Sequence, residues 1–289
     1  MLGTRANGML ICQQIAPKLA DEILQECLNA TDGKGLFQFR QYKTRGHYRP
    51  RREAYLREGN ISFPYSYSGN LMHSQPVPRA ISEFIATYCL RTNEASLNGG
   101  VLVNEYPGSA KSNLLYNRDS GVGKHSDNSH TVYLTNTIYS LTVGASRIFR
   151  YRRLGQDTKW NEIMTTHGML ISMKPGFQVV YEHDVPKPLR KHQALYAQES
   201  KHRRFVPQND DMYRYNLTVR PQCIPCEQAR RSACPRVRKK RSLGVDNNKE
   251  TKAPAELPGV TYPKKHILRM IETEEKKHLG GDDDEVYNF

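Results

Sequence analysis

The chain has 289 residues, and its 43 Lys and Arg against 29 Asp and Glu give a net charge of +14. That length suits one substantial domain, with or without tails, and the charge favours a polyanionic partner, nucleic acid first and an anionic membrane surface second. Composition excludes a transmembrane segment, because no run approaches the ~18 apolar residues that span a bilayer. The apolar run Met9–Cys12 is too short for a signal peptide, and six scattered Cys form no disulfide framework. We therefore expect a non-secreted protein of the nucleus or cytoplasm; a basic surface without a polyanionic partner is the alternative.

Residues 17–29 and 76–90 are predicted to form two amphipathic helices. Pro17 and Pro78 suit the first turns, and Thr31-Asp32-Gly33 ends the first helix. Apolar side chains recur at helical spacing, which places them on one face of each helix. These faces consist of Leu19, Ile23, Cys27 and Leu28 in the first helix, and of Ile81, Phe84, Ile85 and Tyr88 in the second.

Between these helices, residues 37–75 combine cations with aromatic rings. Cations pair with phosphates and aromatic faces stack on bases, so this composition suits a nucleic-acid surface. A solvated loop with a few aromatic side chains in the core is an equally open alternative. The cations are Arg40, Lys43, Arg45, Arg49, Arg51, Arg52 and Arg57, and the aromatic residues include Tyr42, Tyr48, Tyr55, Phe63, Tyr65 and Tyr67.

After residue 100 the pattern changes to that of strands. Strands are predicted over 101–106, 121–127, 138–152, 168–173, 177–183 and 214–220. Gly144 interrupts the third of these, which we therefore expect to form two paired or bent strands. Over 177–183, alternation places His183 on the same face as Phe177 and Tyr181, so His183 is expected to point to the interior.

His125 and Asp127 form a candidate pair of metal ligands. Residues i and i+2 of a strand point to one face, so a strand over 121–127 would present the imidazole and the carboxylate together. Alone, such a pair also occurs on ordinary surfaces. Joined by a distant second histidine, it makes the facial triad of non-haem Fe(II) sites, which leaves positions open for substrate and oxygen. His183 is the candidate for that third ligand.

The strand over 214–220 alternates strictly. Its polar face would carry Arg214, Asn216, Thr218 and Arg220, and its apolar face Tyr215, Leu217 and Val219. Burying such a polar row without a ligand is unfavourable, so an exposed sheet face is one explanation. The other is a dicarboxylate held between two guanidinium groups, because a carboxylate pairs bidentately with arginine.

The remaining segments are irregular. Residues 184–212 are predicted to form a polar loop, and 222–289 a charged, largely disordered tail. Within that tail, Cys223, Cys226 and Cys234 lack a fourth partner and make a poor zinc site. The basic run Arg236–Arg241 is either a nuclear-localisation signal or a phosphate-binding arm.

Four motifs follow one another along the chain: Asn104-x-Tyr106, His125-Ser126-Asp127, His183 and Arg214-Tyr-Asn-x-Thr-x-Arg220. In this order the chain resembles the AlkB-like Fe(II)/2-oxoglutarate dioxygenases over about residues 50–221. The Arg-x-Asn-x-Thr-x-Arg strand is the most specific part of the resemblance. Linking pieces that also fit are Pro50-Arg51, Tyr65-x-Tyr67-Ser68-Gly69, Leu141–Ser146 and His167–Met173.

The resemblance implies an α+β fold that is mainly β, a double-stranded β-helix (jelly-roll) with flanking N-terminal helices. It divides the chain into an N-terminal helical segment (1–36), a nucleotide-recognition lid (37–75), a dioxygenase core (76–221) and the tail (222–289).

It also implies roles for individual residues. His125, Asp127 and His183 would bind Fe(II). Arg214 would pair with the distal carboxylate of 2-oxoglutarate, and Arg220 would lie near the end that chelates iron. Asn104, Tyr106, Asn216 and Thr218 would complete that pocket. In the lid, Tyr65 or Tyr67 would stack on a flipped-out base, and Arg51 would contact a phosphate or a base.

The implied activity is oxidative demethylation of N-alkylated bases in DNA or RNA, which consumes 2-oxoglutarate and O2 and releases succinate, CO2 and formaldehyde. Repair enzymes of the family commonly carry an acidic residue where this chain has Ser129. Without that carboxylate, cation–π contacts would recognise a cationic base, or the base would be neutral.

Two alternatives stay open: the same chemistry on a protein side chain, and a non-catalytic nucleic-acid-binding module. We expect a monomer without membrane association and identify no partner protein.

Overall fold

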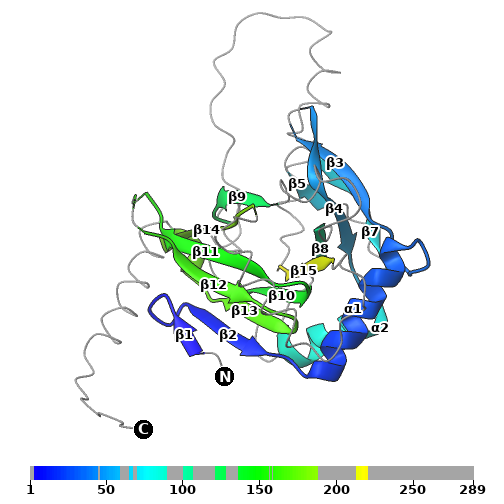
Figure 1. The fold of residues 1–289 in the computed structure, drawn as a ribbon, viewed down its shortest axis with the longest axis horizontal. Helices are drawn as coiled ribbons and strands as arrows, with labels where there is room; N and C mark the ends of the chain where they lie inside the picture. Colours follow the sequence, from blue (N-terminus) through cyan, green and yellow to red (C-terminus); the bar gives the residue numbers. More distant parts are fainter. Residues whose placement is uncertain are drawn as a thin grey trace, which may run out of the picture.

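The computed structural model describes residues 3–44, 46–58, 65–67, 70–89, 100–106, 121–127, 136–155, 157, 159–187 and 213–220. Two antiparallel sheets pack face to face, and helices cover the outer side of the larger one (Figure 1). The mainly β, jelly-roll fold class predicted from the sequence is confirmed. Among the described residues, no helix is both long and apolar enough to span a bilayer.

The larger sheet has nine strands. Their order across the sheet is β1 (Gly3–Arg5), β2 (Leu10–Gln14), β13 (Met169–Met173), β10 (Ile138–Gly144), β15 (Arg214–Val219), β8 (Val101–Tyr106), β4 (His47–Leu56) and β3 (Arg40–Thr44), with β7 (Ser74–Gln75) paired to β4. The smaller sheet has the order β12 (Asn161–Thr165), β11 (Arg147–Arg153), β14 (Tyr181–Val185) and β9 (Val122–His125). A separate hairpin joins β5 (Tyr65–Tyr67) to β6 (Asn70–Met72).

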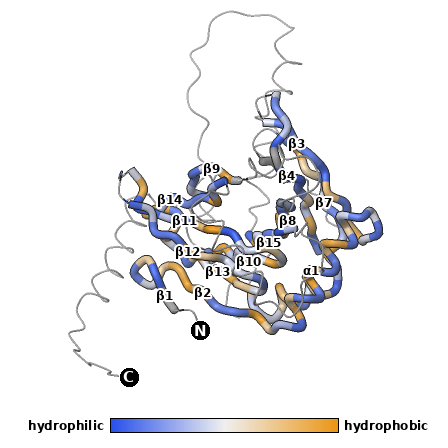
Figure 2. Tube along the Cα trace, in the orientation of Figure 1, coloured by the Kyte–Doolittle hydropathy of each residue, from blue (hydrophilic) through white to orange (hydrophobic). Residues whose placement is uncertain are grey.

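The helices form where the apolar periodicity predicts them. The prediction over 17–29 is confirmed as α1 (Pro17–Thr31), and the one over 76–90 as α2 (Arg79–Phe84) followed by the π-helical turn η1 (Ile85–Cys89). Their apolar faces pack on the outer face of the larger sheet, where Ile23 and Phe84 are fully buried with Leu217. Figure 2 shows the contrast between the apolar strands β2 and β13 and the hydrophilic β3.

The predicted interruption of the 138–152 segment at Gly144 is confirmed, and its two halves form the strands β10 and β11. The two strands do not pair with each other but lie in different sheets. The chain crosses between the sheets at Gly144, which has a φ of +85° and lies so close to the Tyr213 carbonyl that a Cβ would be 2.2 Å from it.

The predicted strand over 177–183 begins instead with a helical turn, α5 (Phe177–Val180). Gly176, at a φ of +89°, turns the chain there, and its carbonyl accepts the backbone N–H groups of Val179 and Val180. The strand β14 starts only at Tyr181, so Phe177 and Val179 do not alternate with His183 as expected.

Other strands were not predicted. β1 and β2 precede α1, so residues 1–36 are not solely helical, and β12 follows β11. The segment 37–75 contributes β3 and β4, and β4 is an integral strand of the larger sheet because it pairs with β8. Ser129, the side chain of Tyr67, most of 184–212 and the whole 222–289 tail, with its cysteines and basic run, lie outside the described residues.

Candidate metal and cosubstrate site

Strand β15 directs its polar side chains into a cavity between the two sheets. Arg214, Asn216, Thr218 and Arg220 line this cavity, while Tyr215, Leu217 and Val219 belong to the core beneath the helices. The two-residue period of a strand produces this division. The polar row is therefore buried, and the prediction of an exposed sheet face is excluded.

Arg214 is held at one end of the row. Its side chain is only 3% exposed, its guanidinium carbon lies 4.8 Å from the centre of the Tyr106 ring, and its Nη2 donates to Thr142 Oγ1 at 3.1 Å. Tyr106 is its direct partner on β8, so the pairing of the two strands creates the contact. A fixed, desolvated guanidinium is well suited to a carboxylate, which it can pair with bidentately.

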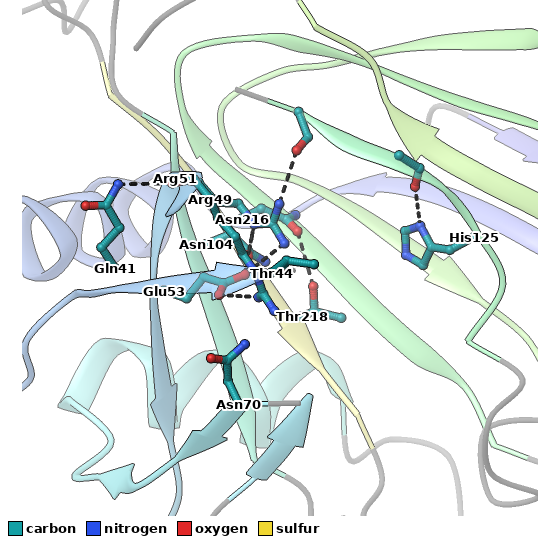
Figure 3. A network of polar contacts seen from close by, with 12 residues as sticks. Gln41, Thr44, Arg49, Arg51, Glu53, Asn70, Asn104, His125, Asn216 and Thr218 are labelled. Carbon is teal, nitrogen blue, oxygen red and sulfur yellow. Dashed lines mark hydrogen bonds and ion pairs between the residues drawn. The ribbon is translucent and has the colours of Figure 1, made fainter. Parts of the chain in front are cut away.

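The middle of the row is a hydrogen-bonded polar surface. Asn216 Nδ2 donates to Ser140 Oγ at 2.9 Å, and Thr218 Oγ1 donates to Asn216 Oδ1 at 3.2 Å. Asn104 lies opposite Asn216 on β8, and Figure 3 shows the two side by side with Thr218. These contacts orient the amides before any ligand binds.

The structure brings the three predicted metal ligands together, two on strands of the smaller sheet and Asp127 just after one of them. The ligand atoms of His125, Asp127 and His183 all lie within 4.8 Å of one another. His125 on β9 pairs directly with His183 on β14, and their ring centres are 4.3 Å apart. The prediction of a strand through residue 127 is wrong in detail, because β9 ends at His125 and the chain bends at Asp127, two residues later.

Hydrogen bonds orient these ligands. The Gly123 carbonyl lies 2.8 Å from His125 Nδ1, and because a carbonyl can only accept, we assign the ring proton to Nδ1. Nε2 is then the nitrogen that can bind a metal. Ser126 Oγ donates to the Tyr181 carbonyl at 2.7 Å, which fastens the bend to the strand that carries His183.

The charges around the cluster favour metal-binding protonation states. Burial raises the pKa of Asp127, but nearby positive charge, that of Arg220 first, outweighs it and holds that pKa below its ordinary value. Arg220 Nη1 lies 3.1 Å from Asp127 Oδ1. Burial, together with the charge of His125, lowers the pKa of His183 to about 3. A charged carboxylate and a neutral imidazole are the forms that bind a metal.

Two atoms indicate that a cation fits here. Within the part of the chain that the structure describes, Asp127 Oδ2 and His183 Nδ1 are buried without a hydrogen-bond partner. Buried polar atoms are normally paired, so such atoms need an explanation. Two histidines and one carboxylate, beside an open cavity, are the donor set of non-haem Fe(II) enzymes, and the residues present fit that metal.

Arg51 and Tyr65, two of the residues predicted to contact substrate, point into the protein. Arg51 lines the cavity, yet its Nε donates to Glu53 Oε1 at 2.9 Å and to Asn104 Oδ1 at 3.0 Å, and its Nη1 donates to the Gly121 carbonyl at 3.1 Å (Figure 3). The Tyr65 ring is 6% exposed.

One face of the Tyr65 ring stacks on Tyr55, with 5.0 Å between the ring centres, and its hydroxyl accepts a hydrogen bond from Arg220 Nη1 at 3.1 Å. Arg51 and Tyr65 therefore connect the 37–75 segment to the polar row of β15, Tyr65 through Arg220 and Arg51 through the adjacent Asn104.

Sequence reasoning missed Glu53 and Gln178. Glu53 lies two residues after Arg51, on the same face of β4, where it also pairs with Arg49 Nη1 at 2.5 Å. A lone acidic residue inside a basic run is a signal that could have identified it. No sequence pattern indicates a role for Gln178, because its position depends on the helical turn α5, which was not predicted.

The fold and the site together define a class: a double-stranded β-helix with two histidines and one carboxylate near a buried arginine row is the architecture of the Fe(II)- and 2-oxoglutarate-dependent oxygenases. A family model described as the 2OG-Fe(II) oxygenase superfamily matches residues 8–220. The chain belongs to this superfamily. It is an enzyme that uses Fe(II), 2-oxoglutarate and O2.

Solved structures similar to the chain include that of OsALKBH1, with 15% identity, coverage of 74% of this chain and 97% of that one, and a TM-score of 0.46. A Pseudomonas putida prolyl-4-hydroxylase has 11% identity, coverage of 73% and 92%, and a TM-score of 0.42. No curated protein sequence matches the chain significantly.

Proposed function

We propose that the protein is a dioxygenase that removes methyl groups from N-alkylated bases in DNA or RNA. The observation that carries the proposal is the placement of the Arg214–Arg220 row along the same cavity as His125, Asp127 and His183. In this proposal, the three ligands hold the metal at one side of the cavity, and the buried guanidinium of Arg214 pairs with a carboxylate of 2-oxoglutarate.

Each residue has a role in this proposal. His125, Asp127 and His183 bind Fe(II), and Arg214 pairs with the distal carboxylate of 2-oxoglutarate. Arg220 holds Asp127 near the end of the cosubstrate that chelates the metal. Asn104, Tyr106, Asn216 and Thr218 form the walls of the cosubstrate pocket.

With Fe(II) held by His125, Asp127 and His183, the site would supply oxidative chemistry in which 2-oxoglutarate and O2 are converted to succinate and CO2. One oxygen atom of O2 would enter a C–H bond of the substrate methyl group, and the other would leave in succinate. The resulting N-hydroxymethyl group loses formaldehyde, and the ring nitrogen regains its hydrogen or its lone pair. The protein binds and orients both substrates.

A nucleic-acid substrate is supported by the hairpin of β3 and β4, which lies at the edge of the larger sheet and projects away from the smaller sheet (Figure 1). Tyr48 is 62% exposed there, and the ammonium of Lys43 lies 4.4 Å from the centre of its ring. Arg40 and His47 are exposed on the same hairpin. Exposed cations beside an exposed ring suit phosphates and unstacked bases, and the net charge of +14 acts in the same direction. We propose that residues 37–75 serve as a nucleic-acid-recognition lid.

The test measures succinate and formaldehyde released from 2-oxoglutarate in the presence of methylated DNA and RNA oligonucleotides. Wild-type protein is expected to release both in equal amounts, and His125→Ala to release neither. Mass spectrometry of the nucleosides identifies the demethylated base and distinguishes DNA from RNA. Turnover with methylated or proline-containing peptides, and none with any oligonucleotide, would overturn the proposed substrate class.

A further inference from the structure

The backbone of Asp127 lies outside the β-sheet hydrogen-bonding pattern. Strand β9 ends at His125, so the Asp127 N–H has no partner strand, although the side chain is only 6% exposed. A buried backbone N–H normally has a partner, because leaving it unpaired is unfavourable. The partner of this one is a side chain, the amide of Gln178.

Gln178 is almost completely buried, at 1% exposure, and both ends of its amide are used. Its Oε1 accepts the backbone N–H of Asp127 at 2.9 Å, and its Nε2 donates to Met173 Sδ at 3.3 Å. Met173 is in β13 of the larger sheet, and Asp127 follows β9 of the smaller one. The side chain therefore joins the bend at Asp127 to the opposite sheet.

The turn α5 makes this reach possible. In the strand expected over 177–183, Gln178 and His183 would lie on opposite faces, because their separation is odd. The positive φ of Gly176 starts a helical turn instead, and β14 begins only after it. Gln178 and His183 can then both face the metal cluster.

We propose that Gln178 is a positioning residue for the metal: it fixes the backbone of Asp127 so that the carboxylate faces His125 and His183. Arg220 holds the carboxylate from the cavity side, and Gln178 holds the main chain from behind. Outer partners of this kind typically change metal affinity by about 10–100-fold when they are removed. The inference rests on Asp127 being a ligand, and it is independent of whether the substrate is a nucleic acid.

The experiment compares Gln178→Met with Gln178→Glu in Co(II) titrations of the full chain, followed by visible absorption. Met has a similar length but no oxygen acceptor, whereas Glu keeps the oxygen that accepts the Asp127 N–H. Gln178→Met is expected to bind Co(II) about 10-fold more weakly, with an altered spectrum. Gln178→Glu is expected to bind at least as tightly as wild type, with the wild-type spectrum.

A matched control separates positioning from general stability. Thr31→Val removes partly buried hydrogen bonds to Glu105 Oε1 (2.6 Å) and Tyr215 OH (2.7 Å) on the far face of the larger sheet. It is expected to lower the Tm and to leave Co(II) affinity unchanged. Equal weakening in Thr31→Val and Gln178→Met, equal loss in both Gln178 variants, or wild-type behaviour of Gln178→Met would each overturn the inference. Retained affinity in Asp127→Ala would instead contradict the assignment of Asp127 as a ligand.

Discussion

Strand β15 and the bend at residues 125–127 place their functional groups in different ways. β15 lies between β8 and β10, and its backbone ladder alone directs Arg214 and Asn216 into the cavity. Residues 125–127 lie at the end of an edge strand of the smaller sheet, and side-chain hydrogen bonds hold Asp127 and Ser126. The Arg214–Arg220 row is therefore built by strand periodicity, whereas the position of residues 125–127 depends on specific contacts with the 178–181 segment.

This difference predicts which substitutions change the positions of other site residues and which do not. A substitution in the row removes one contact from a rigid strand and leaves its neighbours in place. A substitution at residues 125–127, or at a residue that hydrogen-bonds them, is expected to move a metal ligand. Among the described residues, no backbone hydrogen-bond ladder holds Asp127 in place. The following changes test that contrast, from the largest expected effect to the smallest.

Replacing a metal ligand has the largest expected effect. His183→Ala and Asp127→Ala each remove one of three donors, and the metal affinity is expected to fall by more than about 100-fold, since loss of a mere outer partner already costs about 10–100-fold. Anaerobic Fe(II) or Co(II) titration measures this. As control, His167→Ala removes a histidine that contacts Asp21 and the Gly144 N–H away from the cavity, and metal binding should persist. Metal binding by both ligand variants at wild-type affinity would contradict the site.

Arg214→Met tests the row. The metal is expected to bind as in wild type, while affinity for 2-oxoglutarate falls by at least about 2 kcal/mol, or about 30-fold, because a buried carboxylate loses its charge partner. Calorimetric titration of the metal-loaded protein measures both. Arg152→Met removes an arginine that pairs with Glu182 on the smaller sheet, and it should not change 2-oxoglutarate binding. Equal affinity in the Arg214 and Arg152 variants would refute the role of Arg214.

Arg51→Met tests the connection between the two regions. Arg51 joins β4 to Asn104, which lies on β8 beside the row, and to the Gly121 carbonyl just before β9. Its loss leaves buried acceptors without a partner, so the free energy of unfolding is expected to fall by about 1–3 kcal/mol. Urea denaturation measures this change. Lys18→Met, in an exposed pair with Glu22, should leave the midpoint unchanged, and an equally silent Arg51→Met would contradict a connecting role.

Tyr65→Phe has the smallest expected effect. It removes the hydrogen bond from Arg220 Nη1 to the Tyr65 hydroxyl, and Arg220 keeps its contact with Asp127. A single hydrogen bond contributes about 1 kcal/mol, so 2-oxoglutarate affinity is expected to fall about fivefold, with stacking on Tyr55 preserved. A decrease as large as that of Arg214→Met would mean that the lid segment governs the pocket more strongly than the row does.

The same contrast explains how much the sequence could predict. The row on β15 and the inward direction of His183 follow from residue alternation, which local sequence determines, and both predictions are confirmed. The clustering of His125, Asp127 and His183 was also predicted, but through a resemblance and a strand that in fact ends at His125.

Long-range contacts could not be predicted. Gln178 reaches Asp127 only because Gly176 adopts a positive φ and starts a helical turn, and a segment rich in β-branched and aromatic residues gives no sign of it. Arg51 and Tyr65 were assigned to substrate through the lid that the resemblance implies, together with the basic, aromatic composition of residues 37–75. Composition identifies a basic aromatic segment, but which of its members turn inward depends on the pairing of β4 with β8.

The central claim is that His125, Asp127 and His183 bind one metal ion while Arg214 pairs with the distal carboxylate of 2-oxoglutarate. A crystal structure of the protein with Mn(II) and 2-oxoglutarate, with anomalous diffraction data, tests this most directly. We predict one anomalous peak about 2.0–2.3 Å from His125, Asp127 and His183, with the distal carboxylate of 2-oxoglutarate paired to Arg214. A peak that lacks any one of these three ligands, or a cosubstrate whose distal carboxylate lies away from Arg214, would contradict the account.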